Sequence, residues 1–203
     1  MKKHINKSLI LTITIVLTSC ASYYYPINPS RLPYTNNLSE KGIDFSYRYN
    51  VLHDRGNEKL SKKEQKRGIK IIAVKITNNT DSSITITQDV GFFVGNSQVY
   101  PEEPFLVRKL VNQTVASYLP YLLFTSFQLN LNGTVFPIGY ALGPLLAAGN
   151  MLAANNANNL FYKELKDNDI INLTVKKGET IYGLVAFSGI GFDPLTMHSV
   201  SKK

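Results

Sequence analysis

A stretch of 53 residues in the middle of this chain, from Leu110 to Tyr162, contains not one charged side chain. Exposed loops are rich in polar residues, so this stretch is expected either to bury its side chains or to meet an apolar partner. Apolar residues dominate two parts of it, Val115 to Leu131 and Phe136 to Ala154. We therefore expect a helical hairpin, inserted at about residues 104–166 into a domain of another kind.

The second part of the uncharged stretch has the residue spacing of a helix. Proline is tolerated in the first turn of a helix, so the pattern predicts a helix that starts near Pro144, covers Leu145 to Leu160 and ends near Lys163. Gly139 and Gly143 can allow a neighbouring helix to approach closely. Five positions share one face and are predicted to lie against protein: Leu145, Leu146, Gly149, Leu152 and Leu160. Three asparagines take other directions: Asn150, Asn155 and Asn158.

The sequence allows several environments for this insert. In one interpretation the hairpin packs on a sheet of its own domain and supplies part of the core. In another it presents an exposed apolar surface to a partner protein or dips into a membrane leaflet. A pair of membrane-crossing helices is the least favoured, because glycines, prolines and asparagines interrupt both apolar parts.

Alternation of apolar and polar residues predicts β-strands on both sides of the insert. From Ile43 to Val51 every second residue is apolar, which turns Phe45 toward a core and Ser46 outward. Similar patterns predict strands at residues 72–77, 84–87, 90–94, 98–100, 170–175, 180–187 and 195–200. Short strands at this spacing indicate a mainly β fold, an antiparallel immunoglobulin-like β-sandwich over residues 42–203.

The N-terminus combines a basic, an apolar and a small-residue region. Lys2, Lys3 and Lys7 make the first region basic, residues 8–17 are apolar, and Leu17-Thr18-Ser19-Cys20 follows. This order resembles the lipobox signal peptide of bacterial lipoproteins. The resemblance implies that residues 1–19 are a signal peptide and that Cys20 carries a covalent diacylglycerol and an N-acyl chain. At about 0.8 kcal/mol per buried CH₂, such an anchor is effectively permanent.

Two alternatives compete with the lipobox: a conventional signal peptide with an unrelated cysteine, and an uncleaved helical anchor. The second is disfavoured because the apolar run falls well short of the ~20 residues that a membrane span needs. The whole chain resembles small lipoproteins of Gram-negative bacteria, and residues 176–187 resemble the penultimate hairpin of immunoglobulin-like domains in such proteins. No metal or further cofactor is expected.

Residues 20–41 are predicted to form a tether. Pro26, Pro29 and Pro33 favour an extended chain, and the tyrosines at positions 23–25 either lie at the level of lipid headgroups or pack on the domain. In Gram-negative lipoproteins an aspartate after the cysteine retains the protein at the inner membrane. By this resemblance Ala21 implies the outer membrane, and the absence of an acidic export stretch implies its periplasmic face.

The charge of the chain is mildly positive. The formal net charge of +8 falls to +5 when the three lysines of the signal peptide are removed. An exported, lipid-anchored chain does not meet nucleic acid, so anionic lipid headgroups are the better match. Five basic residues are expected either to contact lipid phosphates or to lie on a solvated loop or short helix: Lys59, Lys62, Lys63, Lys66 and Arg67.

The sequence has no recognisable catalytic motif of the H-E-x-x-H, G-x-S-x-G or P-loop type. His53 and Asp54 are neighbours and could form an acid–base pair, but neighbours on a strand point to opposite faces, so a solvated pair is favoured. We therefore expect a non-enzymatic binding or scaffolding module that is held at the membrane through Cys20 and meets an envelope protein partner. The alternatives are a carrier of an apolar ligand, lined by the uncharged insert, and an envelope hydrolase.

Overall fold

The computed structural model describes residues 20–200, which fall into two units. The larger, here the sheet unit, comprises Tyr24–Asn112 and residues 158–200. The smaller, here the hairpin unit, comprises residues 20–23 and Gln113–Ala157. The expected signal peptide, with Leu17, Thr18 and Ser19 of the lipobox, lies outside the described residues.

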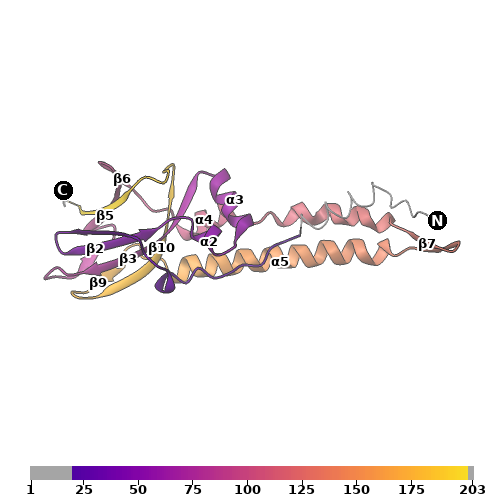
Figure 1. Cartoon of the computed structure of the whole chain (residues 1–203), viewed down its shortest axis with the longest axis horizontal. Helices are drawn as coiled ribbons and strands as arrows, with labels where there is room; N and C mark the ends of the chain where they lie inside the picture. The colour runs from indigo at the N-terminus through magenta and orange to yellow at the C-terminus, as the bar shows by residue number, and fades with distance from the viewer. Residues whose placement is uncertain (1–19, 201–203) are drawn as a thin grey trace. The chain divides into compact units, whose positions relative to one another are not determined.

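The strands of the sheet unit pair antiparallel (Figure 1). One sheet has four strands, in the order β1 (Asn36–Glu40), β2 (Ile43–Arg48), β3 (Ile69–Asn78) and β10 (Thr180–Ser188). Another has three, in the order β11 (Leu195–Ser199), β5 (Val90–Val94) and β6 (Ser97–Val99). Two short strands form a separate pair, β4 (Ile84–Thr85) and β9 (Thr174–Val175).

The four-stranded and three-stranded sheets share one apolar core. Phe45 on β2 lies 5.9 Å from Phe92 on β5, measured between ring centroids, and Phe92 lies 5.4 Å from Phe187 on β10. All three rings are almost completely buried. Each such ring contributes about 1.5–3 kcal/mol through its removal from water, so these contacts hold the two sheets together.

The alternation around Phe45 correctly predicts strand β2. Ile43, Phe45 and Tyr47 all face the core. Ser46 lies on the other face as expected but is buried rather than exposed, because its hydroxyl donates a hydrogen bond of 2.6 Å to Asn37 Oδ1 in β1. Val51 is in a short helix, α2 (Val51–Asp54), and not in the strand, which ends before the positive φ of Asn50.

Further strands differ from the prediction in presence or in length. Strand β1 was not predicted, because its sequence Asn-Asn-Leu-Ser-Glu lacks apolar alternation. It reaches β2 through Lys41 and Gly42, both with positive φ, which suits a two-residue hairpin turn. The strands predicted at residues 84–87 and 170–175 shorten to β4 and β9, and the first of them ends before Thr87, whose φ is 70°.

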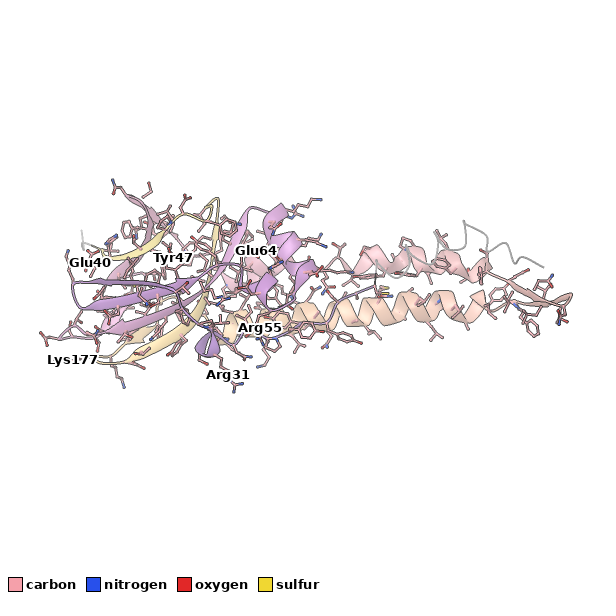
Figure 2. All side chains as sticks on the ribbon, viewed as in Figure 1. Arg31, Glu40, Tyr47, Arg55, Glu64 and Lys177 are labelled. Carbon is pink, nitrogen blue, oxygen red and sulfur yellow. The ribbon has the colours of Figure 1, made fainter. Side chains whose placement is uncertain are left out.

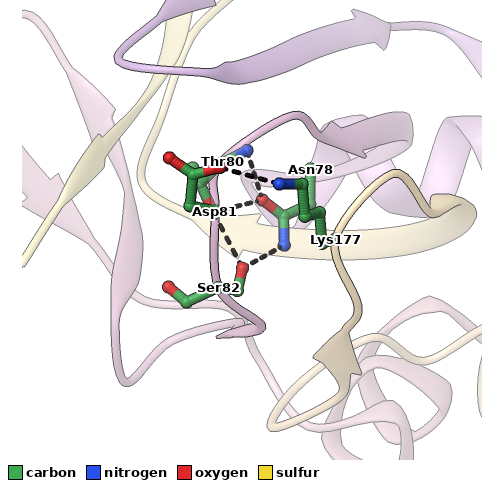
Figure 3. A network of polar contacts seen from close by, with 5 residues as sticks. All are labelled: Asn78, Thr80, Asp81, Ser82 and Lys177. Atoms are coloured by element: carbon green, nitrogen blue, oxygen red, sulfur yellow. Dashed lines mark hydrogen bonds and ion pairs between the residues drawn. The ribbon is translucent and has the colours of Figure 1, made fainter.

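A buried asparagine ties the turn after β3 to the strand β9 (Figure 3). The Asn78 amide nitrogen donates to the carbonyl oxygens of Ser82 and Val175, both at 2.9 Å. Its amide oxygen accepts from the backbone N–H of Thr80 at 3.0 Å and from the Thr80 hydroxyl at 2.6 Å. The Asn78 side chain therefore supplies hydrogen-bond partners to backbone groups beyond the end of strand β3.

The segment that follows residue 23 is part of the sheet unit and not a tether. Tyr24 and Ile27 are buried, and the Tyr24 ring packs 5.8 Å from the Phe161 ring. A short 3₁₀ helix, η1 (Pro29–Arg31), follows. The sheet unit thus begins at Tyr24, earlier than the predicted start at Gly42, because Tyr24 and Ile27 bury apolar surface that a free tether would expose to water.

The hairpin unit consists of two helical segments joined by a β-hairpin. They are η2 (Val115–Ser126), β7 (Leu129–Leu131), β8 (Thr134–Phe136) and the long helix α5 (Gly139–Asp167), whose last residues belong to the sheet unit. The helix over Leu145 to Leu160 is confirmed, but its predicted start at Pro144 is wrong. Pro144 lies inside α5, where it removes one backbone hydrogen bond near the helix start. Asn132 and Gly133, both with positive φ, form the turn between β7 and β8. An Asn-Gly pair is typical of such a hairpin turn, so the sequence contains a signal for it.

Gly139 and Gly143 are both sites of close approach to the segment Phe124–Phe127. A Cβ atom on Gly139 would lie 2.2 Å from the Phe124 carbonyl oxygen, and one on Gly143 would lie 2.9 Å from the Thr125 backbone nitrogen. Only glycine therefore permits this distance between α5 and η2. Four buried residues form the small core of the hairpin unit: Tyr118, Tyr121, Ala147 and Ala154.

The expected mainly β composition is wrong, since more of the described residues lie in helices than in strands. Helix α5 alone accounts for much of the excess. Two further helices belong to the sheet unit, α3 (Glu58–Lys66) and α4 (Pro104–Val111). The antiparallel sheets were predicted correctly, and the insert is helical over most of the expected residues 104–166.

Candidate lipid-anchoring site

Cys20 is exposed in the hairpin unit and lines a surface hollow of about 350 Å³. Ala21 and Tyr23 line the hollow beside it. The rest of its wall comes from α5: Leu145, Leu146, Gly149, Asn150 and Ala153. The only cysteine of the sequence therefore lies next to Leu145, Leu146 and Gly149. These are three of the five positions that the sequence predicts to lie against protein.

Two side-chain amides hold the backbone directly after Cys20. Asn150 Oδ1 accepts a hydrogen bond of 2.6 Å from the Ala21 N–H, while Asn150 Nδ2 donates to the Leu146 carbonyl oxygen at 2.8 Å. Gln113 accepts from the Ser22 N–H at 3.3 Å and donates to the Ser22 carbonyl oxygen at 2.8 Å. We call this pair of contacts the amide clasp. It holds Ala21 against α5 and Ser22 against the segment before η2, so the backbone directly after Cys20 is fixed on the hairpin unit.

An apolar stripe runs along the exposed side of α5 next to Cys20. It consists of Leu142, Leu145, Gly149 and Leu152, which share one face of the helix. Leu145 is 69% exposed and Leu152 is 70% exposed, and nothing lies within 4 Å of a Cβ built on Gly149. The prediction that Leu145, Gly149 and Leu152 lie against protein is therefore wrong.

The side of α5 that does lie against protein is made of small residues. Gly143, Ala147 and Ala154 are buried toward η2, and Leu146 is half-buried at the edge of the Tyr118–Tyr121 cluster. A leucine does not fit where two backbones approach this closely. The leucines are consequently left outside, which reverses the predicted orientation of the helix.

The other positions predicted on α5 are divided between the sheet unit and the hairpin unit. Leu160 belongs to the sheet unit and is 44% exposed rather than packed. Asn158, expected to point away from protein, is buried. Asn150 is half-buried because of its role in the amide clasp. The uncharged surface beside Cys20 is thus restricted to the part of α5 before Asn158.

Glu164 binds the segment at the start of the sheet unit. It accepts hydrogen bonds from the Tyr24 hydroxyl, from the Ile27 N–H at 3.0 Å and from the Asn28 N–H at 2.7 Å. Burial of the ring and the nearby Glu164 carboxylate raise the pKa of Tyr24 above its usual range. All three partners belong to the chain itself, so this cluster fixes the segment and is not built as a ligand site.

The basic residues of the first part of the chain lie on and next to α3, which confirms the short helix among the alternatives. Lys62 and Lys66 are exposed, Lys59 and Lys63 are half-buried, and Arg67 follows at the helix end. The opposite side is buried and includes Glu64, labelled in Figure 2, whose carboxylate accepts from the Ile71 N–H at 2.7 Å. Burial raises the pKa of Glu64 to about 7.

His198 was not predicted to form part of a site, but it belongs to a polar array with Thr196 and Glu40. Thr196 Oγ1 lies 2.9 Å from His198 Nε2, and His198 Nδ1 lies 2.5 Å from Glu40 Oε2. This is the order of contacts of a hydroxyl nucleophile, a base and an orienting carboxylate. Sequence offered one signal for it, because Thr196 and His198 are two apart on a strand and share a face.

His53 and Asp54 do not form an acid–base pair directed at a pocket. Both residues lie on α2, and the distance between His53 Nδ1 and Asp54 Oδ1 is 3.8 Å. The other Asp54 oxygen accepts two hydrogen bonds from the Arg48 guanidinium, at 2.6 and 3.1 Å. Asp54 therefore holds Arg48 in place.

Within residues 20–200, no group of three or more histidine, cysteine, aspartate or glutamate side chains is placed to hold a metal ion. In the same part of the chain, no helix has both the length and the apolar character needed to cross a membrane. Comparisons with protein-family models, with curated proteins and with solved structures gave no match to this chain.

Proposed function

We propose that this chain is a bacterial envelope lipoprotein whose lipid on Cys20 anchors it at the periplasmic face of the outer membrane. Its sheet unit serves there as a non-enzymatic binding or scaffolding module for an envelope protein. The sequence basis is the lipobox Leu17-Thr18-Ser19-Cys20. The proposed covalent additions on Cys20 are a diacylglycerol and an N-acyl chain.

The environment of Cys20 carries this proposal. A lone cysteine with a purely structural role is usually buried, because cysteine packs as a small apolar residue. Cys20 is instead exposed, in a unit whose described residues include no charged side chain. An acyl chain attached there leaves the protein beside leucines and not beside charges, which supports an anchor at this position.

For the sheet unit we propose an immunoglobulin-like β-sandwich. The order β2-β3-β10 corresponds to strands A-B-E of such a domain, and β11-β5-β6 corresponds to F-C-C′. The segment between β6 and β10, where strand D of such a domain lies, contains the helices and the hairpin unit. Domains of this architecture commonly act through their surfaces, which supports a binding module.

The anchor is tested by replacing Cys20 with alanine in cells that are fed a palmitate analogue. The Cys20→Ala chain is expected to take up no label and to keep its signal peptide. A Ser22→Ala chain is the matched control, because Ser22 contributes only backbone atoms to the amide clasp. Labelling of the Cys20→Ala chain, or an unlabelled parent chain, would refute the anchor.

A second candidate function, an envelope hydrolase, is favoured by the array of Thr196, His198 and Glu40. The array lies on partly exposed side chains of β11 and β1. Hydrolysis of p-nitrophenyl acetate by the purified protein, lost in both Thr196→Val and His198→Gln variants, would support this function. Equal rates in parent and variants would exclude it.

A further inference from the structure

We infer that the apolar stripe of α5 lies in the lipid–water interface of the membrane, so that the hairpin unit is an interfacial membrane-binding element and not a spacer. This inference rests on the proposed lipid anchor at Cys20. The occupant of the exposed leucine surface is then lipid, and not a protein partner or a second copy of the chain.

The first argument is the position of the anchor. The amide clasp holds Ala21 and Ser22 on the hairpin unit, so Cys20 cannot move away from α5. The acyl chains of a lipidated cysteine must enter the bilayer directly at that residue. The surface that lines the same hollow, with Leu145 and Gly149, must then lie at the level where those chains enter.

The second argument is the chemistry of the stripe. Leu142, Leu145 and Leu152 expose leucine side chains on one helix face, and Gly149 leaves a gap between them. Insertion of a charge into the acyl region is costly, and the described part of this unit carries none. An exposed leucine face is unfavourable in water but is stabilised when it is buried roughly 5–10 Å into the headgroup–acyl boundary.

The third argument sets the depth. The β7–β8 hairpin ends in Asn130, Asn132 and Gly133, and its strand edges carry backbone groups that the hydrocarbon interior cannot hydrogen-bond. The two exposed tyrosines of this unit, Tyr23 and Tyr140, are of the kind enriched at the headgroup level. Both features fit an element that lies in the interface and not one that enters the bilayer core.

The test uses the full chain, processed in cells, purified and reconstituted into vesicles of phosphatidylethanolamine and phosphatidylglycerol. A cysteine introduced by Leu152→Cys is labelled with the fluorophore NBD, and Lys177→Cys, on an exposed turn of the sheet unit, is the matched control. For an interfacial stripe, nitroxide groups on the upper acyl chain should quench the NBD at position 152 about twofold or more, while iodide in the water should have little effect. The probe at position 177 should show the reverse.

Quenching of the probe at position 152 by iodide and not by nitroxide would overturn the inference. A blue-shifted probe at position 152 without nitroxide quenching would also overturn it, because the apolar contact would then be protein. The parent chain, treated with the same thiol reagent, separates this inference from the proposed anchor. A parent that takes up NBD has an unlipidated Cys20 and refutes the anchor, whereas an unlabelled parent with a water-exposed probe at position 152 refutes the interfacial stripe alone.

Discussion

At the scale of single residues, Asn78, Glu64 and Gln113 lose contact with water, and each makes hydrogen bonds to backbone groups. Among residues 20–200, no buried side-chain nitrogen or oxygen lacks a hydrogen-bond partner. An unpartnered buried polar group costs about 1–3 kcal/mol, so this pairing is a condition of stability. Glu64 is the exceptional case because it can also ionise, and one hydrogen bond from the Ile71 N–H does not replace the water around a carboxylate.

Glu64 makes the stability of the folded chain depend on pH. Its pKa is raised from 4.5 in the unfolded chain to about 7 in the fold, so the folded state holds a proton that the unfolded state has released. The contribution of Glu64 to the free energy of unfolding should therefore be largest below pH 4.5 and fall as the pH rises to 7, by about 3 kcal/mol at 1.36 kcal/mol per pKa unit.

Urea denaturation followed by circular dichroism at pH 5 and pH 8 measures this loss of stability. A Glu64→Gln chain keeps an acceptor for the Ile71 N–H but cannot ionise, so its stability should change much less between the two pH values. The control is Glu58→Gln on the same helix, where the carboxylate is exposed and lies 3.6 Å from Lys62. If Glu64→Gln and parent lose stability equally, Glu64 is not the titrating group.

At the scale of elements, residue volume decides how α5 is oriented. Both sides of its first part are apolar, so the helical period shows which residues share a face but not which face is buried. The buried face is made of Gly143, Ala147 and Ala154, because η2 approaches too closely for larger side chains. The larger residues Leu145 and Leu152 are left on the exposed face.

Two glycines of α5 should respond oppositely to alanine. Gly143→Ala places a Cβ 2.9 Å from the Thr125 backbone nitrogen and should lower the melting temperature of the hairpin unit. Gly149→Ala meets nothing within 4 Å and should stabilise the helix by about 0.5–1 kcal/mol, the usual gain of alanine over glycine in a helix. Thermal melts followed by circular dichroism compare them. Equal effects would contradict the close contact between α5 and η2.

The sheets could be predicted from sequence to a large extent and the site only in part. Strand β2 alternates clearly, and so does the second half of β3 from Val74, although Ile71 to Val74 are buried on both faces of the sheet. Strand β1 has no such pattern and is held by pairing with β2. The leader sequence predicts Cys20 as the acceptor of the lipid, and this remains a prediction. The amide clasp could not be predicted, because Ala21 and Asn150 are 129 residues apart and meet only in the folded chain.

At the scale of the whole molecule, charge is distributed unequally. Among the described residues, every Asp, Glu, Lys and Arg belongs to the sheet unit and none to the hairpin unit. Electrostatic attraction to anionic lipids can therefore act on the sheet unit alone, through residues such as Lys62 and Lys66. The described residues of the hairpin unit carry no charge, so any contact that they make with lipid has to be through uncharged side chains such as Leu145 and Leu152.

Salt separates these two contributions. A mature chain with Cys20→Ala has no lipid of its own, and its flotation with vesicles of phosphatidylethanolamine and anionic phosphatidylglycerol should persist when KCl is raised from about 0.05 to 0.5 M, since apolar burial is not screened. Flotation assays with Leu152→Asp as a second variant should show reduced binding. Release by salt, with no effect of Leu152→Asp, would instead assign binding to the basic residues of α3.

The amide clasp also constrains the order of events during biosynthesis. Ala21 is held by Asn150, so the clasp cannot form until 129 further residues have been synthesised and exported. At about 5–20 residues per second, synthesis of that length takes on the order of ten seconds. During this interval Cys20 is an accessible part of an incomplete chain, and enzymes that modify it would act then. After the hairpin unit closes, the backbone at residues 21–22 is no longer available to them.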